Sequence, residues 1–109
     1  MTYRSHYPRA RFEIVEDADR AVGRIVTDRG ADSLTLVDIA LLPEWRGRGF
    51  GTRLLTEAMD EARAAVLPLR LSVIAHDPGP RRLYERIGFV PVRSGGLHTE
   101  LVWTPPAAS

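Results

Sequence analysis

The sequence predicts an α/β (α+β) fold, a mixed, mostly antiparallel twisted sheet with two main helices in the order βββαβαββ. Three short segments rich in apolar residues come first, and turns containing Asp and Gly separate them. A long stretch with helical apolar spacing follows, and then a strand, a second helix and two more strands. At 109 residues, the chain is expected to form a single domain, 1–109.

The first three strands are expected over residues 10–16, 21–27 and 33–42. The third has mostly apolar residues on both faces, so we expect it to be central and covered on both sides. By strict alternation, its two faces carry Leu34, Leu36, Asp38, Ala40 and Leu42 on one side and Thr35, Val37, Ile39 and Leu41 on the other.

The clearest element is a helix over residues 50–65, whose apolar residues recur at helical spacing on one stripe. After a strand over residues 69–75, Asp77 can cap a second helix that has Pro78 at its first position and runs to about Ile87. The last two strands are expected over residues 89–92 and 97–103, around a turn at residues 94–96. Residues 1–9 are expected to form an arm and 105–109 a short tail.

Composition argues against several classes of function. A formal net charge of +1 gives no overall field for binding nucleic acid or an anionic membrane. No apolar run approaches the length of a membrane span and the N-terminus is no secretion signal, so we expect a cytoplasmic protein. All 15 basic residues are arginine, which is typical of a high-GC bacterial genome. Without cysteine or lysine, the chain has no acyl-cysteine nucleophile and no side-chain amine to modify.

The stretch VDIALLPEWRGRGFGT, residues 37–52, joins a strand to a helix through a turn with three glycines and two arginines. The first N–H groups of a helix have no partner inside it, and the helix dipole is positive there. Glycines let an anion approach the main chain, and the arginines add mobile positive charge. An ordinary turn with solvated arginines is the alternative, but it requires fewer glycines. We therefore expect an anion site.

The spacing of this motif is neither that of a P-loop, which needs a lysine, nor that of the dinucleotide fingerprint G-x-G-x-x-G. It is Arg-x-x-Gly-x-Gly at Arg46, Gly49 and Gly51, and LYERIGF follows at residues 83–89. The two segments resemble the acyl-CoA loop and the second signature of the GCN5-related N-acetyltransferase (GNAT) family. The resemblance covers about residues 10–103. It implies a GNAT-like fold that lacks the usual first strand and first two helices.

The resemblance also implies acetyl-CoA as cosubstrate and no metal. The loop at residues 47–52 would hold the CoA pyrophosphate, largely through main-chain N–H groups. Strands 33–42 and 69–75 would run parallel and splay apart, and the backbone of residues 39–41 would pair with the pantetheine arm. The expected cofactor-binding residues are Ile39, Ala40, Leu41, Arg46, Gly47, Arg48, Gly49, Phe50, Gly51, Thr52 and Asp77. The family more often has Asn at position 77, and a plain helix cap is the alternative role for this carboxylate.

Tyr84, the tyrosine of LYERIGF, matches the residue that acts as general acid in many family members. Aminolysis of a thioester expels a thiolate. A phenol, with a pKa of about 10, can donate a proton to the sulfur and still be protonated at pH 7. The alternative is a tyrosine packed in the core with its hydroxyl satisfied.

A base is also needed, because an alkyl ammonium is almost fully protonated at neutral pH. Asp38 is the favoured candidate, since it lies on an otherwise apolar strand face where burial would raise its pKa. A structural carboxylate bonded to Arg24 is an equally good interpretation. The other candidates are His76, His98 and Glu100.

Two functions remain open at this point. The first is an N-acetyltransferase that moves the acetyl group of acetyl-CoA to a primary amine by direct attack in a ternary complex. The alternative is a catalytically weak or inactive acyl-CoA-binding or partner-dependent interaction module, which the short N-terminal part and Asp77 would suit. The acceptor, a small-molecule or peptide amine, is not identified. An exposed sheet edge and face favour a homodimer.

Overall fold

The computed structural model describes residues 10–76 and 78–106. They form one six-stranded sheet with the spatial order β1-β2-β3-β4-β6-β5. The predicted element order is confirmed, with a 3-10 turn added after the third strand. The predicted arm, Asp77 and residues 107–109 of the tail lie outside the described residues. The elements are β1 (Arg11–Asp17), β2 (Arg20–Arg29), β3 (Leu34–Leu41), η1 (Pro43–Trp45), α2 (Phe50–Ala65), β4 (Leu69–Ile74), α3 (Pro78–Ile87), β5 (Val90–Gly95) and β6 (His98–Trp103).

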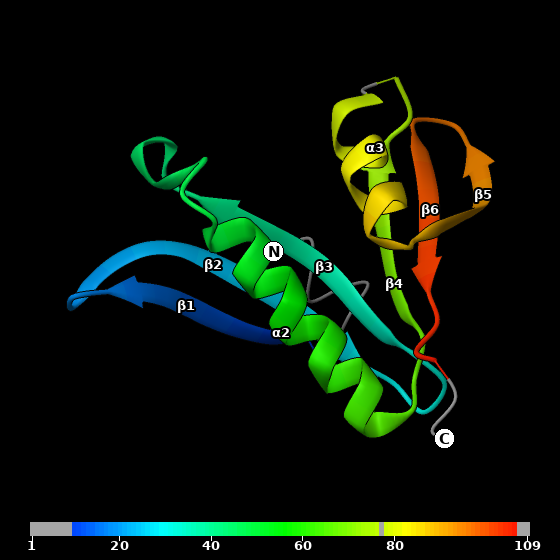
Figure 1. Ribbon diagram of the computed structural model, residues 1–109, viewed down its shortest axis with the longest axis horizontal. Coiled ribbons are helices and arrows are strands. Elements are labelled where there is room, and N and C mark those ends of the chain that lie inside the picture. The colour runs from blue at the N-terminus through cyan, green and yellow to red at the C-terminus, as the bar shows by residue number, and fades with distance from the viewer. Residues whose placement is uncertain (1–9, 77, 107–109) are drawn as a thin grey trace.

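The sheet is antiparallel except at one place, the pair β3–β4. These two strands are parallel and pair only at Leu34–Leu69 and Thr35–Arg70. Beyond these pairs β3 and β4 diverge, as Figure 1 shows. The predicted mixed, mostly antiparallel sheet with a splayed parallel pair is therefore confirmed.

Both helices lie on the same face of the sheet (Figure 1). The predicted stripe of α2 is buried there, and Tyr84 and Ile87 of α3 pack against the same core. The buried residues of this core come from α2 and from five strands or strand ends: Ile25, Leu34, Leu36, Leu54, Leu55, Ala58, Ala62, Leu69, Leu71, Val73, Phe89, Leu101 and Trp103. Within residues 10–76 and 78–106, neither helix is long and apolar enough to cross a bilayer.

The predicted faces of β3 are wrong beyond Leu36. Opposite β2, Leu36 pairs with Thr27 and Asp38 pairs with Val26, which leaves Val37 without an opposite residue. Since neighbouring residues of β2 point to opposite faces, this irregularity places Asp38 on the face away from the helices. Strict alternation had predicted that Asp38 lies on the same face as Leu36. The strand is central, as predicted, but from Val37 onward it is only half-buried.

The final hairpin turns later than the sequence predicted. Ser94 continues the ladder opposite Thr99, and their hydroxyl oxygens lie 3.2 Å apart. β5 therefore extends to Gly95, and the turn falls at residues 96–97.

Helix α2 ends on Val66, a valine in the left-handed region with φ 56°. This conformation is costly for a β-branched residue, and the side chain is 81% exposed, so little burial compensates for it. We expect Val66→Gly to raise the free energy of unfolding by about 1 kcal/mol, measured by urea denaturation. Val66→Ala is the matched control and should gain less, because alanine keeps its Cβ. A lower stability for Val66→Gly than for wild type would contradict this account of the helix end.

Candidate functional site

A cavity of about 280 Å³ lies where β3 and β4 separate, on the face that carries the helices. Most of its lining residues were predicted from the sequence as site residues. The two others, Leu55 and Leu83, belong to apolar helix faces, so the sequence marks them only as packing residues. The lining consists of Ile39, Leu41, Arg46, Gly47, Gly49, Gly51, Thr52, Leu55, Leu83 and Tyr84.

The loop between β3 and α2 and the first turn of α2 line this cavity with their glycines and Thr52. Gly47 and Gly49 have φ of 74° and 86°, in the left-handed region, although a Cβ at either would meet nothing within 4 Å. Backbone conformation rather than lack of space therefore favours glycine here. Gly49 is the N-cap of α2, and the first helical bond runs from the Arg53 N–H to its carbonyl at 3.0 Å. The N–H groups of residues 50–52 precede that bond and suit an anion.

Each of the two arginines of the loop makes one contact with a neighbouring residue. The Arg46 Nε–H donates to the Leu41 carbonyl at 3.2 Å. The Arg48 guanidinium lies over the ring of Trp45, 4.9 Å from its centroid. Trp45 in turn meets Phe50 edge-on, with the ring centroids 5.4 Å apart. Both arginine side chains remain exposed, so their charges are accessible beside the loop.

The end of β3 offers a strand edge to the same space. Residues 39–41 pair with β2 on one side and have no partner from β4 on the other. Ile39 and Leu41 direct their side chains into the cavity, whereas Ala40 lines a separate hollow on the other face. An extended ligand lying along this edge would meet backbone groups and two apolar side chains.

Tyr84 lies on α3 and lines the cavity from the side opposite the loop and β3. Its ring meets Phe89 edge-on at 5.6 Å, and the Phe89 N–H donates to the Tyr84 carbonyl at 3.0 Å where the helix ends. Burial raises the pKa of the Tyr84 phenol above its ordinary value of 10.0, because the phenolate loses solvation. The phenol is therefore protonated at neutral pH, as a proton donor must be.

None of the four base candidates lines this cavity. Asp38 Oδ2 accepts a hydrogen bond from Arg24 Nε at 2.8 Å, on the face away from Tyr84. Glu100 accepts from Arg70 at 3.0 Å, and His76 and His98 are exposed. Among the residues that the structure describes, no group of His, Asp and Glu could hold a metal ion. Asp77 lies outside those residues, so its expected contact to the ligand stays a prediction.

Comparison with known proteins places this geometry in a family. Residues 8–91 match the profile of the acetyltransferase (GNAT) domain. Over 72 residues the chain is 36% identical to the [ribosomal protein bS18]-alanine N-acetyltransferase of Salmonella typhimurium. That match covers 65% of this chain and 49% of the relative, so the chain spans about half the length of the curated relative it matches.

Solved structures share the fold. An acetyltransferase from Thermus thermophilus is 27% identical with a TM-score of 0.77, over 89% of this chain and 65% of that one. The ribosomal-protein-S18-alanine N-acetyltransferase from Escherichia coli has a TM-score of 0.78 at 22% identity, over 99% and 77%. A GNAT acetyltransferase from Elizabethkingia anophelis, solved with acetyl-CoA bound, has a TM-score of 0.77 at 15% identity, over 94% and 82%.

Proposed function

The chain belongs to the GNAT acetyltransferase family, and we propose that it transfers the acetyl group of acetyl-CoA to a primary amine. One observation carries the proposal. A helix N-terminus with left-handed glycines, an open strand edge and a half-buried tyrosine line a single cavity. These are an anion site, a site for an extended chain and a proton donor, which suit the binding of a phosphate-bearing thioester and the departure of its thiolate.

In this proposal the pyrophosphate of CoA binds at the N-terminus of α2. The N–H groups of residues 50–52 donate to it, with Arg46 and Arg48 beside it. The pantetheine arm lies along residues 39–41, where β3 lacks a partner from β4. Asp77 remains in the proposed set as the residue before α3.

The reaction is a direct aminolysis. The neutral amine attacks the thioester carbonyl, a C–N bond forms and the C–S bond breaks. Tyr84 gives its proton to the departing sulfur, and the proton of the attacking nitrogen leaves through a base or water. The products are an N-acetyl amine and CoA with a free thiol, so no oxidant or metal is needed. In this proposal both substrates occupy the chain together and the acetyl group passes directly to the amine; the chain has no cysteine for an acyl-cysteine intermediate.

We propose Asp38 as the group that receives the proton from the amine, through water, across the gap between β3 and β4. Asp38→Asn should then lower kcat/KM by about 100-fold. Arg24→Gln is the matched variant, because it removes the 2.8 Å pair but keeps the carboxylate, and it should retain most activity. Initial rates over a pH series check this prediction. If both variants lose the same melting temperature and keep the wild-type rates, Asp38 has a structural role and does not act as the base.

The activity test is turnover by the purified chain, followed as release of free thiol and as acetylation of the acceptor by mass spectrometry. The amine panel begins with a peptide that has a free N-terminal alanine, because the curated relative is an alanine N-acetyltransferase. A small aliphatic amine, an amino acid and an aminoglycoside complete it. We expect acceptor-dependent thiol release. Binding of acetyl-CoA without turnover on any amine would favour the acyl-CoA-binding module instead.

A further inference from the structure

Strand β1 forms one edge of the sheet, and no other strand in residues 10–76 and 78–106 pairs with its outer side. Its sequence, RFEIVED, contains neither proline nor lysine, and its four charged residues are of both signs, so that a strand with complementary charges can lie against it. The strand is regular, because the irregularity in its pairing with β2 adds a residue on β2, Val22. Ile14 at its centre is 63% exposed. An edge of this kind is a template for a further strand.

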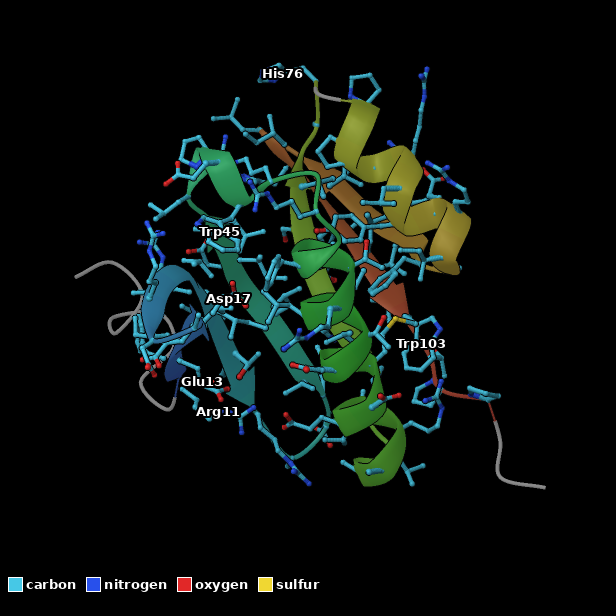
Figure 2. The ribbon with its side chains drawn as sticks, turned by 60° about the vertical axis from the view of Figure 1, so that its left-hand side comes forward. Arg11, Glu13, Asp17, Trp45, His76 and Trp103 are labelled. Carbon is cyan, nitrogen blue, oxygen red and sulfur yellow. The ribbon has the colours of Figure 1, made fainter. Side chains whose placement is uncertain are left out.

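We propose that two copies of this chain pair antiparallel through β1, with the two-fold axis at Ile14, so that their sheets continue into one. Figure 2 shows Arg11, Glu13 and Asp17 along this edge, where Arg11 also reaches Glu61 of α2. In this proposal the partner is a second copy of the chain, and the strand that it adds to the sheet is its own β1.

Symmetry limits the possible registers. In an antiparallel pair, opposite residues point to the same face, and a two-fold axis perpendicular to the sheet keeps each residue on its own face. A residue must therefore lie opposite itself at the axis. Glu13, Ile14 and Val15 are the three central choices in this seven-residue strand.

Charge selects among these registers. Centred on Glu13, the pair would place two glutamates opposite each other. Centred on Val15, it would place Glu13 opposite Asp17. Centred on Ile14, it places Arg11 opposite Asp17 and Ile14 opposite Ile14, with no like charges facing. A parallel in-register pair would set every charge against its own kind. Of the three central registers, only the one at Ile14 is complementary in charge and apolar at its centre.

The exposed apolar residues agree with this register. Phe12 and Ile14 both point to the face away from the helices, where they are 40% and 63% exposed. Across the axis, each Ile14 meets its counterpart directly and the other copy's Phe12 diagonally. Neither residue lines the cavity that holds Tyr84, so pairing leaves that cavity open.

Single-cysteine cross-linking tests the proposal, since the chain has no cysteine of its own. Ile14→Cys should form an intermolecular disulfide under mild oxidation, because opposite residues in antiparallel strands have Cα atoms about 4.5–5.5 Å apart, within disulfide range. Phe12→Cys should not cross-link to itself, because its counterpart lies four residues away, about 13 Å. Val92→Cys, on β5 and 54% exposed, controls for random collision. Equal cross-linking of all three would overturn the proposal.

Sedimentation equilibrium adds a test that needs no cross-link. Wild type should dimerise. Asp17→Arg should raise the dimer dissociation constant by about tenfold, because it faces Arg11 of the other copy twice. Arg11→Asp combined with Asp17→Arg should restore pairing. Arg11 also binds Glu61 at 2.6 Å, so melting temperatures are compared for each variant. A wild type that stays monomeric at every concentration would refute the inference, and the Ile14→Cys result does not depend on Arg11.

Discussion

Replacing Tyr84 by phenylalanine is expected to lower kcat by about 100-fold and to leave the dissociation constant for CoA almost unchanged. The ring would keep its edge-on contact with Phe89 and its place in the cavity wall, so only the proton donor is lost. Two measurements separate an effect on the chemical step from an effect on binding. Single-turnover rates with acetyl-CoA and an accepted amine report the first, and the calorimetric affinity for CoA reports the second. An unchanged kcat would remove Tyr84 from the mechanism.

The pH dependence gives an independent check of the same residue. Burial raises the pKa of Tyr84 above its ordinary value of 10.0, so the donor is protonated at neutral pH and loses its proton only in strongly alkaline solution. In wild type, the rate should rise as the amine loses its proton and fall again only above pH 10. Tyr84→Phe should lack that alkaline decline. A decline at the same pH in both proteins would assign it to another group or to unfolding.

The largest expected loss of stability comes from Gly23→Ala, at about 3 kcal/mol. A Cβ on Gly23 would clash with the Ala40 carbonyl oxygen and lie 2.7 Å from Leu41 Cδ2, both on β3. Since one of these atoms is backbone, β2 and β3 must separate to admit it. The strain would fall on the strand edge that we propose for the pantetheine arm, so affinity for acetyl-CoA should drop as well.

Gly95→Ala is the matched control for that substitution. Gly95 also lies in a strand, but a Cβ there meets nothing within 4 Å. Urea denaturation of both variants measures the difference. If both lose the same stability, the close approach of β2 to β3 would not be the cause.

The sequence predicted the helices better than the faces of the strands. Both helix ranges, 50–65 and 78–87, agree with the structure, because an apolar stripe and glycine or proline at the starts define them. The displaced residue at Val37 was not predictable, since both faces of β3 are apolar there and alternation gives no signal. Asp38 was therefore assigned to the wrong face. Its alternative interpretation, a carboxylate bonded to Arg24, describes the contact that the structure shows.

In the candidate site, too, some features were predictable from the sequence and others were not. The glycines of the loop were predictable because left-handed backbone restricts the residue type. The contacts of Arg46 with Leu41 and of Arg48 with Trp45 were not, since they depend on how the turn at residues 43–45 folds back on the strand and on Phe50. Leu55 and Leu83 were not predicted as lining residues, because the sequence pattern of an apolar side chain is the same in a core and in a cavity wall.

Calorimetric titration of the purified chain with acetyl-CoA, with free CoA and ADP as comparison ligands, tests the central claim most directly. The account predicts one acetyl-CoA bound per chain with micromolar affinity, and weaker binding of ADP, which reaches the loop but not the strand edge. ADP binding as tightly as acetyl-CoA would mean that the loop binds phosphate and the gap between β3 and β4 does not hold pantetheine. No binding of acetyl-CoA by the folded chain would contradict the account.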